Sequence, residues 1–171
     1  MVGELFDKKK YFLPQLIASG EAMKNGIEVI EPLLQRDSGG DDKKDIIIIG
    51  TVSGDIHDIG KNLVTLMLKN HGFKVFDLGK DVAKEVFLEN ALNHNAAIIG
   101  MSALMTTTMR EMGNVVEYCR ENGYKGDFMV GGAVITQDYA EEIGAFYSAD
   151  AADAVKVAKK IIGGKTGNER S

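Results

Sequence analysis

The strongest constraint on the fold of this chain is a regular alternation between short apolar runs and longer segments with helical spacing. The first run, residues 46–49, consists of consecutive isoleucines and is too short and too continuous for an amphipathic helix. Such a run is typical of a strand that is buried on both faces, as strands of parallel sheets are. Residues 60–70 follow with apolar side chains at helical spacing and a His-Gly stop signal. The pattern predicts a buried strand and the helix that covers it.

The same alternation continues toward the end of the chain and predicts five β/α units. Right-handed crossovers between parallel strands favour a doubly wound, flavodoxin-like (Rossmann-like) α/β sheet with strand order 2-1-3-4-5. Ligands of such sheets bind at the carboxyl ends of the strands, beside the switch point between strands one and three. The predicted strands are 46–49, 74–78, 96–101, 127–130 and 146–149, and the predicted helices are 60–70, 82–93, 107–122, 137–143 and 151–162.

The chain divides into three parts. Its 171 residues suit one medium domain with a short appendage. Residues 1–40 are predicted to form a partial helical cap segment and a polar linker, residues 41–163 the main domain, and residues 164–171 a disordered tail. The helix of the first part carries one apolar stripe, which consists of Leu16, Met23, Ile27, Ile30 and Leu34.

Composition excludes several classes of function. The formal net charge of −5 is spread along the chain without a basic block, which argues against nucleic-acid binding. No apolar run approaches the ~18 residues of a membrane span, and the N-terminus lacks the pattern of a signal peptide. We therefore expect no membrane partner and a cytoplasmic location. The single cysteine, Cys119, falls among apolar positions of a predicted helix and is expected to serve packing.

The loop after the first strand, residues 50–62, is glycine-rich and leads into a helix. It does not match a phosphate-binding P-loop, because Gly54 and Gly60 enclose five residues rather than four and Asn62 follows Lys61 in place of Ser or Thr. The dinucleotide fingerprint G-x-G-x-x-G is also absent from this turn. Neither kind of nucleotide site is predicted here.

The same loop carries a histidine between two acidic residues, Asp55 and Asp58. A histidine that ligates a metal commonly donates its other N–H to a carboxylate, so His57 with Asp55 as its partner is a candidate ligand. A solvated polar loop residue is the alternative. A structural zinc site would need four ligands, whereas His71 and His94 fall near predicted helix ends. A metal whose other ligands come from a macrocycle fits a single histidine better.

Three short motifs follow one another at the predicted loops: Asp55-x-His57-x-x-Gly60, Ser102-x-Leu104 and Gly131-Gly132. In this order they resemble the signature of cobalamin-binding domains in methionine synthases and corrinoid-dependent methyltransferases. The chain most closely resembles the small corrinoid proteins of methanol and methylamine methyltransferase systems, from about Gly3 to Ile162.

The resemblance implies a cobalamin or related corrinoid bound base-off and histidine-on. It makes His57 the lower cobalt ligand, Asp55 its hydrogen-bond partner and Ser102 the outer member of that relay. It also implies that Leu104 lines a slot for the nucleotide tail of the cofactor.

Further residues are expected to contact the cofactor. Missing side chains at Gly131 and Gly132 would leave room for the tail, although an ordinary strand-to-helix turn explains a Gly-Gly pair equally well. Thr106 and Thr107 are candidates for the phosphate of the tail or for capping their own helix. The remaining expected cofactor contacts are Asp58, Ile59 and Gly60.

The resemblance implies that this protein cannot complete a catalytic cycle by itself. A methyl group would be carried on cobalt, which alternates between Co(I) and methylated Co(III), from a substrate-specific methyltransferase to an acceptor methyltransferase acting on tetrahydrofolate or a thiol. A reductive activase would rescue oxidised cobalt. Fewer than about 45 residues precede the first strand, so the helical cap of the family is incomplete. We therefore expect the N-terminal helix to mediate homo-oligomerisation or docking.

Three alternatives remain beside the methyl carrier. One is a non-catalytic corrinoid storage or sensor protein, and another is the small subunit of an adenosylcobalamin-dependent mutase. The third is a flavodoxin-like domain without a cofactor, in which Asp55 and His57 would be solvated loop residues.

Overall fold

The computed structural model describes Ala22, Gly26 and residues 45–168, with side chains up to Gly164. Ala22 and Gly26 are helical, in agreement with the helix predicted for this segment. The rest of that prediction, including the apolar stripe and the linker to residue 44, lies outside the described residues.

A five-stranded sheet forms the centre of the described domain. All of its strands are parallel, and their order is β2-β1-β3-β4-β5, which confirms the predicted topology. The switch point therefore lies between β1 and β3, as expected. The strands are β1 (Ile46–Thr51), β2 (Lys74–Asp77), β3 (Ile98–Ser102), β4 (Asp127–Gly131) and β5 (Phe146–Tyr147).

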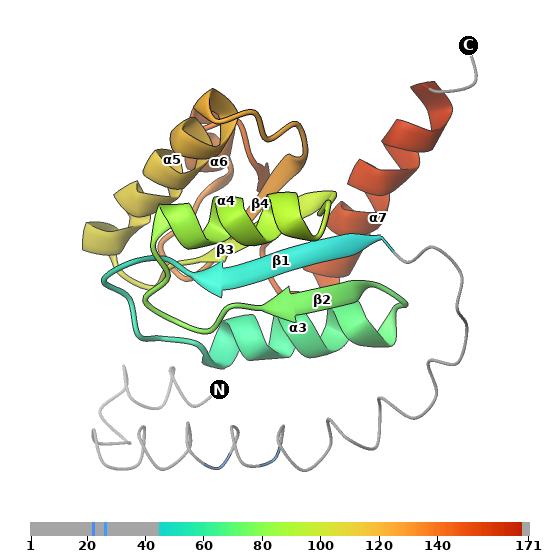
Figure 1. The fold of residues 1–171 in the computed structure, drawn as a ribbon. Helices are drawn as coiled ribbons and strands as arrows, with labels where there is room; N and C mark the ends of the chain where they lie inside the picture. Colours follow the sequence, from blue (N-terminus) through green and yellow to red (C-terminus); the bar gives the residue numbers. More distant parts are fainter. Residues whose placement is uncertain (1–21, 23–25, 27–44, 169–171) are drawn as a thin grey trace. The chain divides into compact units, whose positions relative to one another are not determined.

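Helices cover both faces of the sheet (Figure 1). One face packs against α3 and α7, and the other packs against α4, α5 and α6. The bounds are α3 (Ile59–Asn70), α4 (Lys84–Asn93), α5 (Thr106–Glu121), α6 (Gln137–Glu142) and α7 (Ala151–Asn168).

The continuous apolar runs of the central strands explain this three-layer arrangement. Successive side chains of a strand point to opposite faces, so a strand between two helical layers needs apolar residues at every position. Ile47 and Ile98 belong to the core under α3 and α7, whereas Ile48 and Ile99 belong to the core under α4 and α5. All four side chains are fully buried.

The C-terminal part of the chain differs from prediction at two places. Strand β5 has only two residues instead of the predicted 146–149, because it pairs on one side with the last part of β4 and then leaves the sheet. Helix α7 continues to Asn168 instead of ending at residue 162 as predicted; residues 169–171 lie outside the described residues. An existing helix gains one backbone hydrogen bond for each residue added, which allows it to continue through Gly163 and Gly164.

Other expectations about single residues are confirmed. His71 and His94 are the C-caps of α3 and α4. Cys119 is fully buried in the core, and this burial raises the pKa of its thiol to about 11.

Among the described residues, no helix is both long enough and apolar enough to cross a membrane.

Candidate cofactor-binding site

The candidate site lies at the carboxyl ends of β1 and β3. The loop after β1 carries Asp55 and His57 and runs directly into α3. The loop after β3 runs into α5, and β1 and β3 are neighbours in the sheet with Thr51 paired to Ser102. Parallel strands bring both loops to the same edge, so the topology alone places them beside each other.

Asp55 holds His57 through two hydrogen bonds. Its Oδ1 accepts the backbone N–H of His57 at 3.0 Å and lies 2.7 Å from Nδ1 of the imidazole ring. Asp55 is completely buried, whereas 47% of the His57 side chain is exposed. With Nδ1 donating to the carboxylate, the lone pair of the neutral ring is on Nε2. The arrangement presents Nε2 to a ligand outside the loop.

The second oxygen of Asp55 is held from the loop after β3. Its Oδ2 accepts the backbone N–H of Leu104 at 2.7 Å and the hydroxyl of Thr108 at 2.8 Å. The donors to this oxygen are thus Leu104 and Thr108 rather than Ser102, which was expected to be the outer member of the relay. Thr108 takes that place because the first turn of α5 directs its buried hydroxyl toward Asp55, whereas Ser102 is the last residue of β3.

Burial and hydrogen bonding act on Asp55 in opposite directions. Burial by itself raises the pKa of this carboxyl, but the donors from Leu104, His57 and Thr108 lower it by more. The net pKa lies well below its ordinary range, so Asp55 is a carboxylate at neutral pH. A fixed carboxylate beside Nδ1 keeps the ring in the tautomer whose Nε2 carries the free lone pair, which is the form that ligates a metal.

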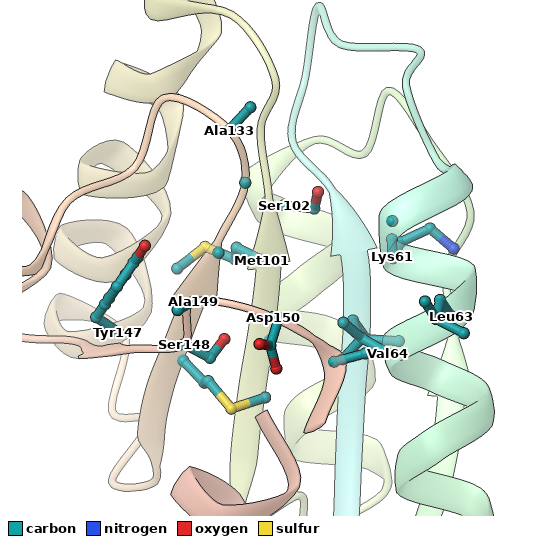
Figure 2. A pocket seen from close by; sticks show the side chains of 17 residues that line it. Lys61, Leu63, Val64, Met101, Ser102, Ala133, Tyr147, Ser148, Ala149 and Asp150 are labelled. Atoms are coloured by element: carbon teal, nitrogen blue, oxygen red, sulfur yellow. The ribbon is translucent and has the colours of Figure 1, made fainter. Parts of the chain in front are cut away.

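A pocket of about 440 Å³ opens beside this loop, between the carboxyl half of the sheet and the first turns of α3 and α7 (Figure 2). Gly60, Lys61 and Val64 of α3 form one side, and the segment from Tyr147 to Ala151 forms the opposite side. Figure 2 shows Ser102 and Ala133 toward one end of the pocket, and Asp150 and Val64 toward the other.

Two predicted glycines border the pocket at positions with little or no room for a side chain. A Cβ on Gly132 would overlap the carbonyl oxygen of Ala103, and its φ of 141° favours glycine. A Cβ on Gly131 would lie 3.0 Å from the carbonyl oxygen of Ser148. Gly132 is therefore required by the fold as well as bordering the pocket, whereas a side chain at Gly131 would make a tight contact with Ser148.

Gly60 behaves differently. It lies in the first turn of α3 and lines the pocket, yet apart from its chain neighbours and the backbone of its own helix no described atom lies within 4 Å of the position of a Cβ there. Glycine is unfavourable in a helix relative to alanine, so the fold gives no reason for it at this position. A ligand that fills the adjoining space would give one.

Of the other predicted cofactor contacts, only some lie at the pocket. Ser102 lines it, but Leu104 does not: its side chain is 41% exposed, and its contribution is the backbone N–H that Asp55 accepts. Thr106 and Thr107 are exposed at the start of α5, outside the pocket lining. They do not cap that helix, since its N-cap is Met105 without a side-chain hydrogen bond.

Asp58 and Ile59 connect the histidine to the helix. Asp58 is the N-cap of α3 without a side-chain hydrogen bond, and its carbonyl oxygen accepts the N–H of Asn62 at 2.8 Å. Both residues are half-buried and absent from the pocket lining. Their described role is to direct the chain from His57 into α3.

Several site residues were missed by sequence reasoning. Thr108 had a detectable signal: it precedes Met112, Val115 and Cys119 at helical spacing, which places a polar residue on an apolar stripe. Tyr147, Ser148 and Asp150 had none, because their place at the pocket depends on how the chain passes from β5 to α7. Among the described residues, no group of three or more His, Cys, Asp or Glu side chains is arranged to hold a metal ion.

Comparisons with known proteins agree with this geometry. Residues 46–157 match a family model described as "B12 binding domain", and residues 1–31 match a second model with the same description. The chain is 46% identical over 164 residues to trimethylamine corrinoid protein 1 of Methanosarcina mazei, covering 94% of this chain and 76% of the relative.

Solved structures show the same similarity. The monomethylamine corrinoid protein of Methanosarcina barkeri has a TM-score of 0.80 and 40% identity, with 94% of this chain and 76% of the other covered. The methanol:cobalamin methyltransferase complex of the same organism contains a chain with a TM-score of 0.70 and 36% identity, with 95% and 62% covered. Family match, identity and fold agree, and the chain belongs to the family of B12-binding domains.

Proposed function

We propose that this protein binds a cobalamin-type corrinoid, with His57 as the lower cobalt ligand, and carries a methyl group on the cobalt between two methyltransferases. The observation that supports this best is the Asp55–His57 pair: a buried carboxylate binds Nδ1 of a half-exposed imidazole and leaves Nε2 without a partner among the described residues, on a loop that leads into the helix lining the pocket. The names of the relatives, which are methylamine corrinoid proteins, support the same class of ligand.

The residues present fit such a cofactor. A corrin ring would itself provide most of the cobalt ligands, so the protein would need to contribute only one, and the single histidine His57 would be that ligand. If the benzimidazole-type base of the cofactor leaves cobalt, the nucleotide tail needs a slot close to the histidine. The pocket and the open space beside Gly60 supply this slot.

When bound, the corrinoid supplies a cobalt centre that can accept and release a methyl group. The role of Asp55 would be to orient the His57 ring and to fix its tautomer. Leu104 and Thr108 keep the carboxylate in place, so that the ring keeps its orientation.

The partners we infer follow from this chemistry. A carrier needs a methyltransferase that loads the methyl group from a specific substrate and a second one that passes it to tetrahydrofolate or a thiol. The similar chain in the methanol:cobalamin methyltransferase complex supports the first of these. A reductive activase is the third partner, since cobalt oxidised outside the cycle must be reduced before it can accept a methyl group.

Reconstitution with hydroxocobalamin tests the ligand assignment. We expect a stoichiometric complex whose Co(II) form shows nitrogen coupling from histidine in electron paramagnetic resonance. In His57→Ala the corrinoid should remain bound more weakly, without that coupling. A wild-type protein that retains no corrinoid would contradict the proposal.

A transfer assay separates a methyl carrier from a corrinoid store. Protein loaded with methylcobalamin is mixed with a methylamine:corrinoid methyltransferase or an acceptor methyltransferase, and loss of the methyl–cobalt absorption is followed. A carrier should be demethylated at a rate that depends on the concentration of the acceptor enzyme. A store would bind the corrinoid with no enzyme-dependent transfer.

A further inference from the structure

The last residue of β2 and the loop that follows it, residues 77–82, contact the end of β1 and the first half of the loop that carries His57. The carbonyl oxygen of Gly79 accepts the N–H of Thr51 at 2.9 Å, and the N–H of Val82 donates to the oxygen of Thr51 at 3.0 Å. Val52 and Val82 also form an isolated parallel bridge. The loop after β2 thus extends the sheet pairing beyond the end of β1.

Asp81 makes the closest contacts to the residues just before the histidine. Its Oδ1 accepts the N–H of Gly54 at 2.7 Å and the hydroxyl of Ser53 at 3.3 Å. Its own N–H donates to the carbonyl oxygen of Asp55 at 3.0 Å. Asp81 therefore fixes the backbone of Asp55, while Leu104 and Thr108 fix the side chain of the same residue.

The backbone of Asp81 is in an unusual conformation. Its φ is 55°, and among the described residues only Asn95 is another non-glycine with positive φ. Such a conformation is unfavourable for a side-chain-bearing residue and persists where surrounding contacts impose it. Here those contacts are the bonds to Ser53, Gly54 and Asp55.

The same loop also holds the chain after the histidine. The ammonium group of Lys61, whose side chain is 1% exposed, lies 2.6 Å and 2.5 Å from the two carboxylate oxygens of Asp77. Asp77 in turn accepts the N–H of Gly79 at 2.8 Å. One loop is thus bonded to Gly54 on one side of His57 and to Lys61 on the other.

We propose that Asp81 is a positioning residue that sets the orientation of His57 toward cobalt through the backbone of Gly54 and Asp55. This inference rests on the proposed function, because it concerns the lower ligand of the same cofactor. Asp81 does not line the pocket, so its loss should change histidine ligation more than retention of the corrinoid.

Three substitutions separate the contribution of the Asp81 side-chain acceptor from that of its backbone conformation. Asp81→Asn keeps an oxygen acceptor and a residue type that tolerates positive φ. Asp81→Gly keeps the backbone conformation but removes the acceptor, and Asp81→Ala loses both. Asn95→Ala is the matched control, since it introduces the same backbone strain at a turn that makes none of these contacts.

Two measurements on the full chain test the inference. In the apoprotein, amide exchange of Gly54 should become about tenfold faster in Asp81→Gly and Asp81→Ala, and should stay near the wild-type rate in Asp81→Asn and Asn95→Ala. In the hydroxocobalamin complex reduced to Co(II), the fraction of spins with histidine nitrogen coupling should fall in the first two variants and be retained in the other two.

Retention of wild-type coupling in Asp81→Gly would overturn the inference, and so would an equal loss in Asp81→Asn or Asn95→Ala. If the wild-type complex itself shows no histidine coupling, the proposed function fails and the inference about ligation falls with it. The two failures are distinguishable, because exchange of Gly54 is measured without any corrinoid.

Discussion

The side chain of Asp55 connects the two loops of the candidate site. It is fully buried, and each of its oxygens accepts two hydrogen bonds. A buried carboxylate with fewer donors would have its pKa raised by burial, would be protonated more readily and would hold an imidazole less well. The donors are therefore as important to the ligand histidine as the carboxylate itself.

Replacing Thr108 should show that this hydroxyl, and not Ser102, supports Asp55. Thr108→Val removes a buried hydrogen bond to a charged group, so we expect a loss of about 1–2 kcal/mol in the free energy of unfolding. Corrinoid affinity should also fall. Ser102→Ala, in which Asp55 keeps all of its donors, should change the free energy of unfolding by less than about 0.5 kcal/mol. Urea denaturation of both variants decides the matter, and a larger loss in Ser102→Ala would contradict the observed relay.

Cys119 should be inert in the folded protein. Its thiol is fully buried with a pKa of about 11, so at pH 8 almost no thiolate is present or accessible. Iodoacetamide should label the protein only in denaturant, as measured by mass spectrometry. Because the folded pKa is raised, the free energy of unfolding should fall as pH rises from the ordinary pKa of a thiol toward 11. Rapid native labelling would contradict the burial of this residue.

At the scale of elements, the first turn of α3 and the loop after β4 face the same pocket with different constraints. Glycine after β4 is imposed by the protein, since a side chain on Gly132 would overlap the backbone of Ala103. Glycine in α3 is not imposed by any described atom. The two positions therefore distinguish a requirement of the fold from a requirement of the ligand.

Alanine substitutions at these two positions should have opposite effects on stability. Gly60→Ala should leave the free energy of unfolding unchanged or raise it by up to about 1 kcal/mol, because alanine is the better helix former. Its added methyl group should lower corrinoid affinity by about tenfold or more. Gly132→Ala should cost about 2 kcal/mol or more through overlap and backbone strain.

Denaturant unfolding and titration with hydroxocobalamin measure both effects. Unchanged affinity in a stably folded Gly60→Ala variant would mean that the cofactor does not occupy the space beside this turn. Wild-type stability of Gly132→Ala would contradict the close approach to Ala103.

At the scale of the whole molecule, the chain separates into a unit of residues 1–39 and a unit of residues 40–171. The second unit contains both cores that cover the sheet, which is the requirement for independent folding. We predict that a fragment of residues 40–171 folds cooperatively and binds hydroxocobalamin. Circular dichroism during thermal unfolding, together with corrinoid titration, checks this, and an unfolded fragment would contradict it.

The N-terminal segment is expected to mediate association. Its apolar stripe predicts that the full chain self-associates or docks with another protein. Light scattering should therefore give a larger mass than that of one chain for the full protein and the mass of one chain for the fragment of residues 40–171. A monomeric full chain would contradict self-association.

The sequence by itself determined the features that depend on local patterns. Continuous apolar runs and helical spacing fixed the strand order, because parallel strands with right-handed crossovers have few alternatives at this length. His57 and Asp55 could be paired from sequence because they are two residues apart, and a loop after the first strand must lie at the carboxyl edge of the sheet.

Only the tertiary structure decided which distant groups complete the site. The donors from Leu104 and Thr108 are 49 and 53 residues from Asp55, and whether a side chain or a backbone N–H reaches it depends on where β3 ends and how α5 begins. The same holds for Asp81, which lies 27 residues from Gly54. Hydrogen bonds require placement within tenths of an ångström, and such placement follows from strand register and helix packing rather than from any repeat in the sequence.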